Sequence, residues 1–160
     1  MVDVVDRATR SRMMAGIRGR DTKPELVLRR LLHGAGLRYR LHARDLPGRP
    51  DIAFPSRRAA IFVHGCFWHR HEGCHWCSSP ASNSDFWSAK FARNVERDAE
   101  VQAAFHLLGW RTAKVWECAL RGQQIEATAA GIVDWVRNGV GDLDTGIVRV
   151  RRNTSVDGQT

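Results

Sequence analysis

The sequence lacks any long apolar run, and no stretch of its 160 residues approaches the roughly 20 apolar side chains that a membrane-spanning helix needs. Residues 1–7 include two aspartates and have neither the apolar stretch nor the small-residue cleavage site of a signal peptide. Internal repeats and low-complexity segments are also missing. Because 43% of the residues are hydrophobic and 26% are charged, the composition argues against disorder. We therefore expect a globular, cytoplasmic protein with a single main domain.

Lysine is scarce as well: only Lys23, Lys90 and Lys114 occur, so most of the positive charge comes from arginine. The net charge is +8, and it is unevenly distributed. Residues 1–58 hold 14 Lys and Arg against 6 Asp and Glu, whereas residues 59–160 hold 11 of each. A compositional bias explains the choice of arginine over lysine but not the uneven distribution. The charge therefore predicts an electropositive amino-terminal surface that binds a polyanion such as nucleic acid.

Hydrophobic periodicity divides the chain into helices and strands. The predicted helices cover residues 9–19, 22–34, 85–108 and 125–137, and the predicted strands cover residues 37–42, 51–54, 59–63 and 111–116. Thr22 and Glu25 fit a capping box at the start of the second helix. The order α-α-β-β-β-α-β-α predicts a three-layer α/β domain, in which a mixed sheet of about four strands is flanked by helices.

Asp51 begins a predicted strand directly after the turn at residues 46–50, so its carboxylate is expected to project from the edge of the sheet. The following strand ends at Val63 and His64, and pairing of the two strands brings His64 and the carbonyl of residue 63 close to Asp51. A carboxylate and a main-chain carbonyl form a hard-oxygen site that suits Mg²⁺. An aspartate after a Pro-Gly turn can also be purely structural, and the pattern alone leaves both interpretations open.

Three of the four cysteines lie close together and among histidines, which favours a metal site over disulfides in a chain without a secretion signal. Cys66, His71 and Cys74 are candidate ligands of a tetrahedral Zn²⁺, and Cys118 can supply the fourth. Cys74 and Cys77 also form a Cys-x-x-Cys pair, so Cys77 can replace His71 in the set. Both sets predict zinc, and the structural alternative is a group of buried thiols without a metal.

Aromatic side chains surround this loop. Phe67 and Trp68 lie between polar ligand candidates, where burial is difficult, so we expect them to be exposed and to stack on bases or wedge between base pairs. His69 is separated from His71 by one residue, so both side chains point the same way if the loop is extended. If His71 binds zinc, His69 remains free to act as an acid or a base.

Six sequence blocks occur in a characteristic order. They are Asp6 to Ser11, Leu46 to Asp51, His64 to His69, Phe86-Trp87, Asn94 to Asp98 and Val115 to Gly122. Together they resemble the very short patch repair (Vsr) family of DNA mismatch endonucleases over residues 3–122. The resemblance implies a restriction-endonuclease-like core with a structural zinc site. It also implies an Mg²⁺-dependent enzyme that nicks one strand 5′ to the thymine of a T:G mismatch, the product of 5-methylcytosine deamination.

The resemblance further implies catalytic roles for individual residues. Asp51 would bind the catalytic Mg²⁺ together with the main-chain carbonyl of Val63. His69 would be the general base for the attacking water, and His64 and Glu25 would hold metal-bound waters and the phosphate. Val63 stands where the family usually has threonine, but a carbonyl ligand is unaffected by this change.

The implied zinc ligands are Cys66, His71, Cys74 and Cys118. The implied DNA contacts are Phe67, Trp68 and Trp87, which would intercalate beside the mismatch, and Met14, which would approach from the other groove. The chain departs from the family pattern by an extra residue, Gly73, before Cys74, and by the spare thiol of Cys77. Both departures concern the zinc loop, so the choice between His71 and Cys77 stays open at this point.

The implied partner is double-stranded DNA with a T:G mismatch, bound by a nucleoid-associated monomer, with mismatch-repair proteins and a cytosine methyltransferase system as further candidates. Residues 1–20 are expected to form a basic helix or arm on DNA, residues 21–140 the endonuclease domain and residues 141–160 a flexible tail. Two other hypotheses are a zinc-stabilised DNA-binding module without nuclease activity and a related nuclease of different sequence specificity.

Overall fold

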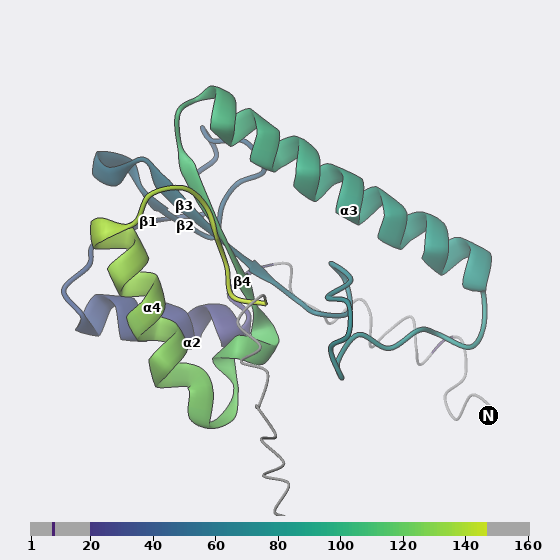
Figure 1. Ribbon diagram of the computed structural model, residues 1–160. Coiled ribbons are helices and arrows are strands. Elements are labelled where there is room, and N and C mark those ends of the chain that lie inside the picture. The colour runs from purple at the N-terminus through teal and green to yellow at the C-terminus, as the bar shows by residue number, and fades with distance from the viewer. Residues whose placement is uncertain (1–7, 9–19, 147–160) are drawn as a thin grey trace, which may run out of the picture.

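A five-stranded mixed sheet lies at the centre of the computed structural model, which describes residue 8 and residues 20–146 (Figure 1). The helices are α2 (Lys23–Gly34), α3 (Ser84–Leu107) and α4 (Ile125–Asn138). The strands are β1 (Arg40–Leu41), β2 (Ile52–Phe54), β3 (Ala59–His64), β4 (Arg111–Trp116) and β5 (Leu143–Asp144). None of the described helices combines the length and the apolar character that a bilayer crossing requires.

The strands follow the order β1-β2-β3-β4-β5 across the sheet. The first three pair antiparallel and are joined by short connections, one of which is the single 3₁₀ turn Pro55–Arg57. Strands β3 and β4 pair parallel, and so do β4 and β5. Parallel pairs need long crossovers, and α3 and α4 supply them. The predicted mixed α/β architecture is therefore confirmed.

The three layers follow from the alternation of side chains along the strands. On one face, Ile61 and Val115 belong to a core that includes Leu28 of α2 and Ile132 of α4. On the opposite face, Phe62 meets the fully buried Phe105 of α3 edge to face, with ring centroids 5.7 Å apart. Helices α2 and α4 thus cover one side of the sheet and α3 covers the other, as Figure 1 shows.

The sheet has one strand more than predicted, and the extra strand lies where a flexible tail was expected to begin. Leu143 pairs with Ala113 of β4, and the side chain of Asp142 accepts a hydrogen bond from the backbone N–H of Thr112 at 2.8 Å. A two-residue strand has no alternation to detect, so its pairing was invisible in the sequence. The remaining tail, residues 147–160, and the predicted helix at 9–19 with Met14 lie outside the described residues.

Two local predictions at the start of the domain also need correction. The strand expected at residues 37–42 shortens to β1, because Leu37 folds back onto α2 through its N–H bond to the Leu32 carbonyl and His42 has a φ of 45°. The expected capping box is altered, because Glu25 accepts from the backbone N–H of Asp21 at 3.0 Å and from the hydroxyl of Thr22 at 3.2 Å. Glu25 therefore secures the chain one residue before the predicted position.

Candidate functional site

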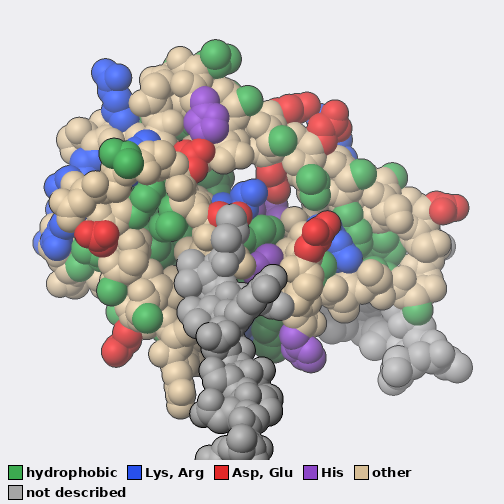
Figure 2. All heavy atoms as spheres, in the orientation of Figure 1, with side chains coloured by type: hydrophobic (Ala, Val, Ile, Leu, Met, Phe, Trp, Pro, Cys, Tyr) green, Lys and Arg blue, Asp and Glu red, His purple; other side chains and the backbone are tan. Residues whose placement is uncertain are grey.

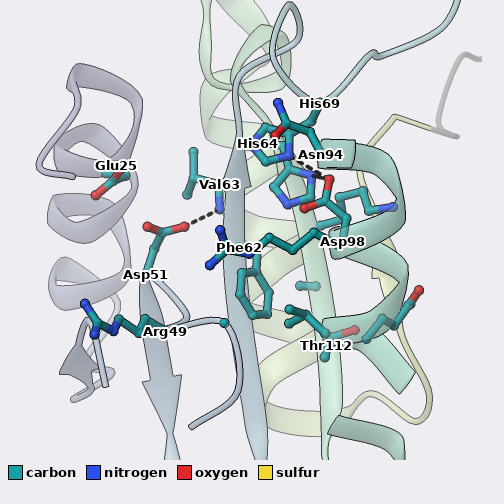
Figure 3. A pocket seen from close by; sticks show the side chains of 16 residues that line it. Glu25, Arg49, Asp51, Phe62, Val63, His64, His69, Asn94, Asp98 and Thr112 are labelled. Atoms are coloured by element: carbon teal, nitrogen blue, oxygen red, sulfur yellow. Dashed lines mark hydrogen bonds and ion pairs between the residues drawn. The ribbon is translucent and has the colours of Figure 1, made fainter. Parts of the chain in front are cut away.

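A cavity of about 250 Å³ lies between the sheet and α3, and it gathers side chains from most of the chain. The predicted catalytic and Mg²⁺-binding residues all line it, namely Glu25, Asp51, Val63, His64 and His69. Their arrangement is visible in Figure 3, where Asp51 and Val63 lie opposite the pair formed by His69 and Asp98. In the space-filling view, acidic, basic and histidine side chains surround a hollow between α3 and the rest of the molecule (Figure 2). The cavity is therefore strongly polar at its rim.

Asp51 is set at the cavity by the turn at residues 46–50. Gly48 has a φ of 65°, and a Cβ there would lie 2.7 Å from Cγ1 of Val101 on α3. Only glycine fits this close approach at a positive φ. The turn therefore packs tightly on α3, and Asp51 emerges beside β3, where its Oδ2 accepts a hydrogen bond from the N–H of Val63 at 2.7 Å.

The surroundings of Asp51 suit a bound cation. Burial, and to a lesser degree the nearby carboxylate of Glu25, raises its pKa to about 6 from an ordinary value of 3.8, even though the N–H of Val63 favours the ionised form. In an extended strand the N–H and C=O of one residue lie on the same edge, so the Val63 carbonyl faces the side where Asp51 lies. Carboxylate and carbonyl oxygens are the ligands that Mg²⁺ prefers. The residues present therefore fit a divalent cation.

Glu25 lies on α2 on the same side of β3 as Asp51 (Figure 3). Its side chain is only 3% exposed and is held by the backbone N–H of Asp21, the hydroxyl of Thr22 and the guanidinium of Arg29. A buried carboxylate is stable only with such partners. Glu25 is therefore a fixed negative charge beside Asp51.

His64 and His69 stack on each other with ring centroids 3.9 Å apart and an interplanar angle of 11°. Burial, assisted by the charge of His69, lowers the pKa of His64 to about 3, so this ring is neutral at physiological pH. Nδ1 of His69 lies 2.7 Å from Oδ2 of Asp98 on α3. The carboxylate assigns the proton to Nδ1 and leaves Nε2 of His69 able to accept a proton.

Asp98 is a site residue to which the sequence analysis gave no role. Burial raises its pKa, but the hydrogen bond from His69 and the positive charges nearby outweigh burial and hold the pKa below its ordinary value. One turn earlier on α3, Asn94 donates to the carbonyl of Trp68 at 3.0 Å and so braces the loop that carries His69. Both residues belong to the block Asn94 to Asp98, and their i, i+4 spacing, which places side chains on one helix face, was the available signal.

A second group forms beside the cavity, at the start of the loop after β3. The ligand atoms of Cys66, His71, Cys74 and Cys118 all lie within 4.8 Å of one another. Nδ1 of His71 is 3.6 Å from Sγ of Cys66 and 3.4 Å from Sγ of Cys118. Zinc bonds of about 2.0–2.3 Å in a tetrahedron give ligand separations of about 3.3–3.8 Å. This donor set therefore fits Zn²⁺, and Cys77 is not part of the group.

The aromatic residues form a cluster next to these two sites. Phe67 contacts Trp68 and Trp87 with ring centroids 5.0 Å and 5.7 Å apart, and Trp68 and Trp87 are 5.9 Å apart. All three are half-buried, while Phe86 beside Trp87 is 61% exposed. The rings therefore support one another and still present part of their surface to solvent, which is less exposure than we expected for Phe67 and Trp68.

The sequence profile of a family described as DNA mismatch endonuclease Vsr matches residues 2–76. The chain is 47% identical over 135 residues to the type II nicking enzyme V.XorIIP of Xanthomonas oryzae pv. oryzae, which is 84% of this chain and 98% of that protein. It is 45% identical over 139 residues to the DNA mismatch endonuclease Vsr of Escherichia coli, which is 85% of this chain and 88% of that protein. The protein therefore belongs to the Vsr family of DNA mismatch endonucleases.

Proposed function

We propose that the protein is an Mg²⁺-dependent endonuclease that nicks one strand of duplex DNA 5′ to the thymine of a T:G mismatch, the product of 5-methylcytosine deamination, and so initiates very short patch repair. The observation that carries the proposal is the meeting of Asp51, the backbone of Val63 and the His69–Asp98 pair in one cavity. Relatives named as a mismatch endonuclease and as nicking enzymes support it.

Asp51 and the Val63 carbonyl would hold the catalytic cation. When bound, Mg²⁺ lowers the pKa of a coordinated water and offsets the charge that develops on the phosphate. Nε2 of His69 accepts the proton of the attacking water, because its Nδ1 is already engaged by Asp98. The carboxylate of Asp98 then stabilises the imidazolium that forms. Glu25 and the neutral ring of His64 orient water and phosphate at the edge of the cavity.

Cys66, His71, Cys74 and Cys118 would hold a structural Zn²⁺. These ligands come from two segments that are distant in the sequence and meet at one edge of the sheet, since Cys118 follows β4 whereas the other three belong to the loop after β3. A tetrahedral site of this kind pins the loop to the sheet. The pinned segment between Cys66 and His71 carries the aromatic pair and His69, so the metal would fix the wedge and the general base together.

Phe67, Trp68 and Trp87 would enter the base stack beside the mismatch. Unstacking costs a few kcal/mol per step and is least costly at a mispaired base. A rigid aromatic wedge therefore favours mismatched over matched DNA. The contacts that support this role are the short ring separations within the cluster and the partial exposure of all three rings.

The proposal is tested with one labelled duplex that carries a T:G mismatch and its matched T:A counterpart, each incubated with MgCl₂ or with EDTA. We expect a single nick 5′ to the mismatched thymine, only with Mg²⁺ and only in the mismatched duplex. Asp51→Asn should abolish the nick and retain binding. Binding without any cut would favour the zinc-stabilised DNA-binding module instead. Cutting that follows the flanking bases and not the mismatch would favour a nuclease of different specificity.

A further inference from the structure

A cluster of charged residues lies directly behind the catalytic carboxylates, and its centre is Arg29 of α2. The guanidinium contacts Oδ1 of Asp21 at 2.8 Å, Oε2 of Glu25 at 3.0 Å and Nε2 of His42 at 3.0 Å. The Arg29 side chain is only 11% exposed, so these contacts are partly shielded from water. One partly buried arginine therefore connects the helix that carries Glu25 with the segment that precedes Asp51.

Asp21, Glu25 and His42 present ligand atoms within 4.8 Å of one another, which is also the arrangement of a metal site. Arg29 argues against that assignment, because its guanidinium already donates to all three residues and would repel a dication placed among them. The positive charge of Arg29 thus offsets the negative charge of the carboxylates in the cluster. The cluster can therefore affect the cavity only through the residues that Arg29 holds in place.

The ring of His42 lies between Arg29 and the carboxylates of the cluster. Its Nε2 is 3.0 Å from the guanidinium of Arg29, 3.4 Å from Oδ1 of Asp21 and 3.9 Å from Oε2 of Glu25. Nδ1 lies 4.0 Å from Oδ1 of Asp51, the carboxylate oxygen that Val63 leaves free. The backbone N–H of His42 also donates to the carbonyl of Asp51 at 3.3 Å. His42 therefore holds the backbone at Asp51, and its ring lies on the open side of the Asp51 carboxylate.

The backbone of His42 indicates that this orientation is imposed. His42 has a φ of 45°, in the left-handed region that only a few per cent of residues other than glycine adopt, although histidine does so more often than most. Such a conformation persists only where the surroundings determine it. Here the surroundings are the contact with Arg29, the backbone bond to Asp51 and the end of β1 directly before His42.

We propose that Arg29 and His42 are positioning residues, which hold the two carboxylates of the cavity in the arrangement that binds the catalytic cation. Arg29 fixes Glu25 directly and holds the ring of His42, and the backbone N–H of His42 in turn holds the start of the segment that carries Asp51. This inference rests on the proposed Mg²⁺-dependent function. Residues behind metal ligands typically change metal affinity or activity by about 10–100-fold when they are substituted.

Metal binding is tested with MnCl₂ alone, by counting free Mn²⁺ with electron paramagnetic resonance. We expect Arg29→Met to weaken Mn²⁺ binding by about tenfold or more, and Arg29→Lys to lie between Met and wild type, because one ammonium cannot reach three acceptors in the geometry of a guanidinium. The matched control is Arg30→Met on the exposed side of the same helix, which should bind Mn²⁺ like the wild type.

Two substitutions at His42 test the proposal even if the Arg29 variants do not fold. His42→Asn tolerates the positive φ and retains a donor near the position of Nδ1, and His42→Gly tolerates the same φ without a side chain. We expect Asn to keep Mn²⁺ affinity within about threefold and Gly to lose about tenfold. Equal affinity of the Gly variant and the wild type would overturn the role of His42.

The nicking assay separates this inference from the proposed function. Wild-type protein that does not nick the mismatched duplex contradicts the proposed function, whatever Mn²⁺ binding shows. The positioning role alone is contradicted if the wild type nicks and the folded Arg29→Met and His42→Gly variants bind Mn²⁺ and turn over as well as the wild type does. The expected pattern is a normal affinity for DNA, a raised requirement for Mg²⁺ and a lower kcat in these two variants.

Discussion

At the scale of single residues, Asp51 shows what burial costs a carboxylate that is proposed to bind a cation. Burial raises its pKa to about 6 in the folded protein, compared with 3.8 for an ordinary aspartate. The folded state therefore holds the proton more tightly than the unfolded state. As the pH rises through this window, the free energy of unfolding falls, by about 3 kcal/mol in total at about 1.4 kcal/mol per pH unit.

Asp51→Asn removes this titration and keeps the shape of the side chain. We expect the variant to be more stable than the wild type by up to about 3 kcal/mol at pH 7.5 in EDTA, and to show no difference below about pH 4. Urea unfolding at the two pH values measures it. MgCl₂ should stabilise only the wild type. Equal stability of the two proteins in EDTA at pH 7.5 would mean that burial of the ionised Asp51 does not destabilise the folded protein.

Asp98 offers a second prediction at this scale, because it orients the proposed general base. Asp98→Asn removes the charge that stabilises the imidazolium of His69, so the single-turnover nicking rate should fall by about 100-fold or more, the usual contribution of general-base catalysis. Binding of mismatched DNA and of Mn²⁺ should be unchanged. The matched control is Glu96→Gln, whose side chain is 63% exposed on the same helix. A normal rate for the Asp98 variant would remove it from the mechanism.

The sequence was sufficient to predict that certain residues in short motifs near the ends of strands lie close together. Asp51 and His64 were predicted to meet because β2 and β3 are adjacent antiparallel strands, and both line one cavity. Asp98 and Arg29 were not assigned roles, because their partners are set by packing. The contact between His69 and Asp98 spans 29 residues and depends on how α3 crosses the sheet. No local pattern encodes that crossing.

At the scale of elements, the loop between β3 and α3 has too few buried apolar residues to hold its own shape. Cys66 and His71 are its buried residues, and His71 stacks on Trp116 of β4 with ring centroids 4.2 Å apart. A metal that joins Cys66, His71 and Cys118 would link this loop to the segment after β4. Under the proposed zinc site, the order of the loop would depend on its metal ligands, which can be identified by experiment.

We expect purified protein to contain one zinc per chain, and His71→Ala to lose it together with several degrees of thermal stability, because metal binding and folding are coupled. Cys77→Ala should keep both, since Cys77 lies outside the group of four ligands. Zinc content by mass spectrometry and thermal unfolding give the answer. His75→Ala is the control for loss of an exposed histidine in the same loop. If only the Cys77 variant lost zinc, Cys77 and not His71 would be the zinc ligand.

The secondary structure was predictable where periodicity extends over many residues. Helix α3 runs from Ser84 to Leu107 and α4 from Ile125 to Asn138, each within about one residue of the prediction, because each is long and is followed closely by a glycine, Gly109 or Gly139. Strands β1 and β5 are two residues each and depend on backbone pairing and on single side chains such as Asp142. Their extent is a tertiary property, which explains both errors.

At the scale of the whole molecule, the net positive charge and most of the proposed site residues lie in different parts of the chain. Residues 59–160 carry no net formal charge. They contain His64, His69, the four proposed zinc ligands and the aromatic cluster. The net charge of +8 belongs to residues 1–58, which include Asp51 and its turn. Under the proposed function, recognition of the mismatch and attraction to the phosphate backbone would therefore fall to different parts of the chain.

This division predicts the salt dependence of DNA binding. Each phosphate contact contributes about −0.9 to the slope of log K against log salt, so Arg7, Arg10 and Arg12 changed together to Gln should make the slope shallower by about two to three. Arg149, Arg151 and Arg152 changed to Gln remove the same charge from the neutral part and should alter it by less than one. Anisotropy titrations with Asp51→Asn protein in EDTA avoid cleavage. A larger change from the carboxy-terminal triple variant would contradict the assignment, because long-range attraction would then not reside in the amino-terminal arginines.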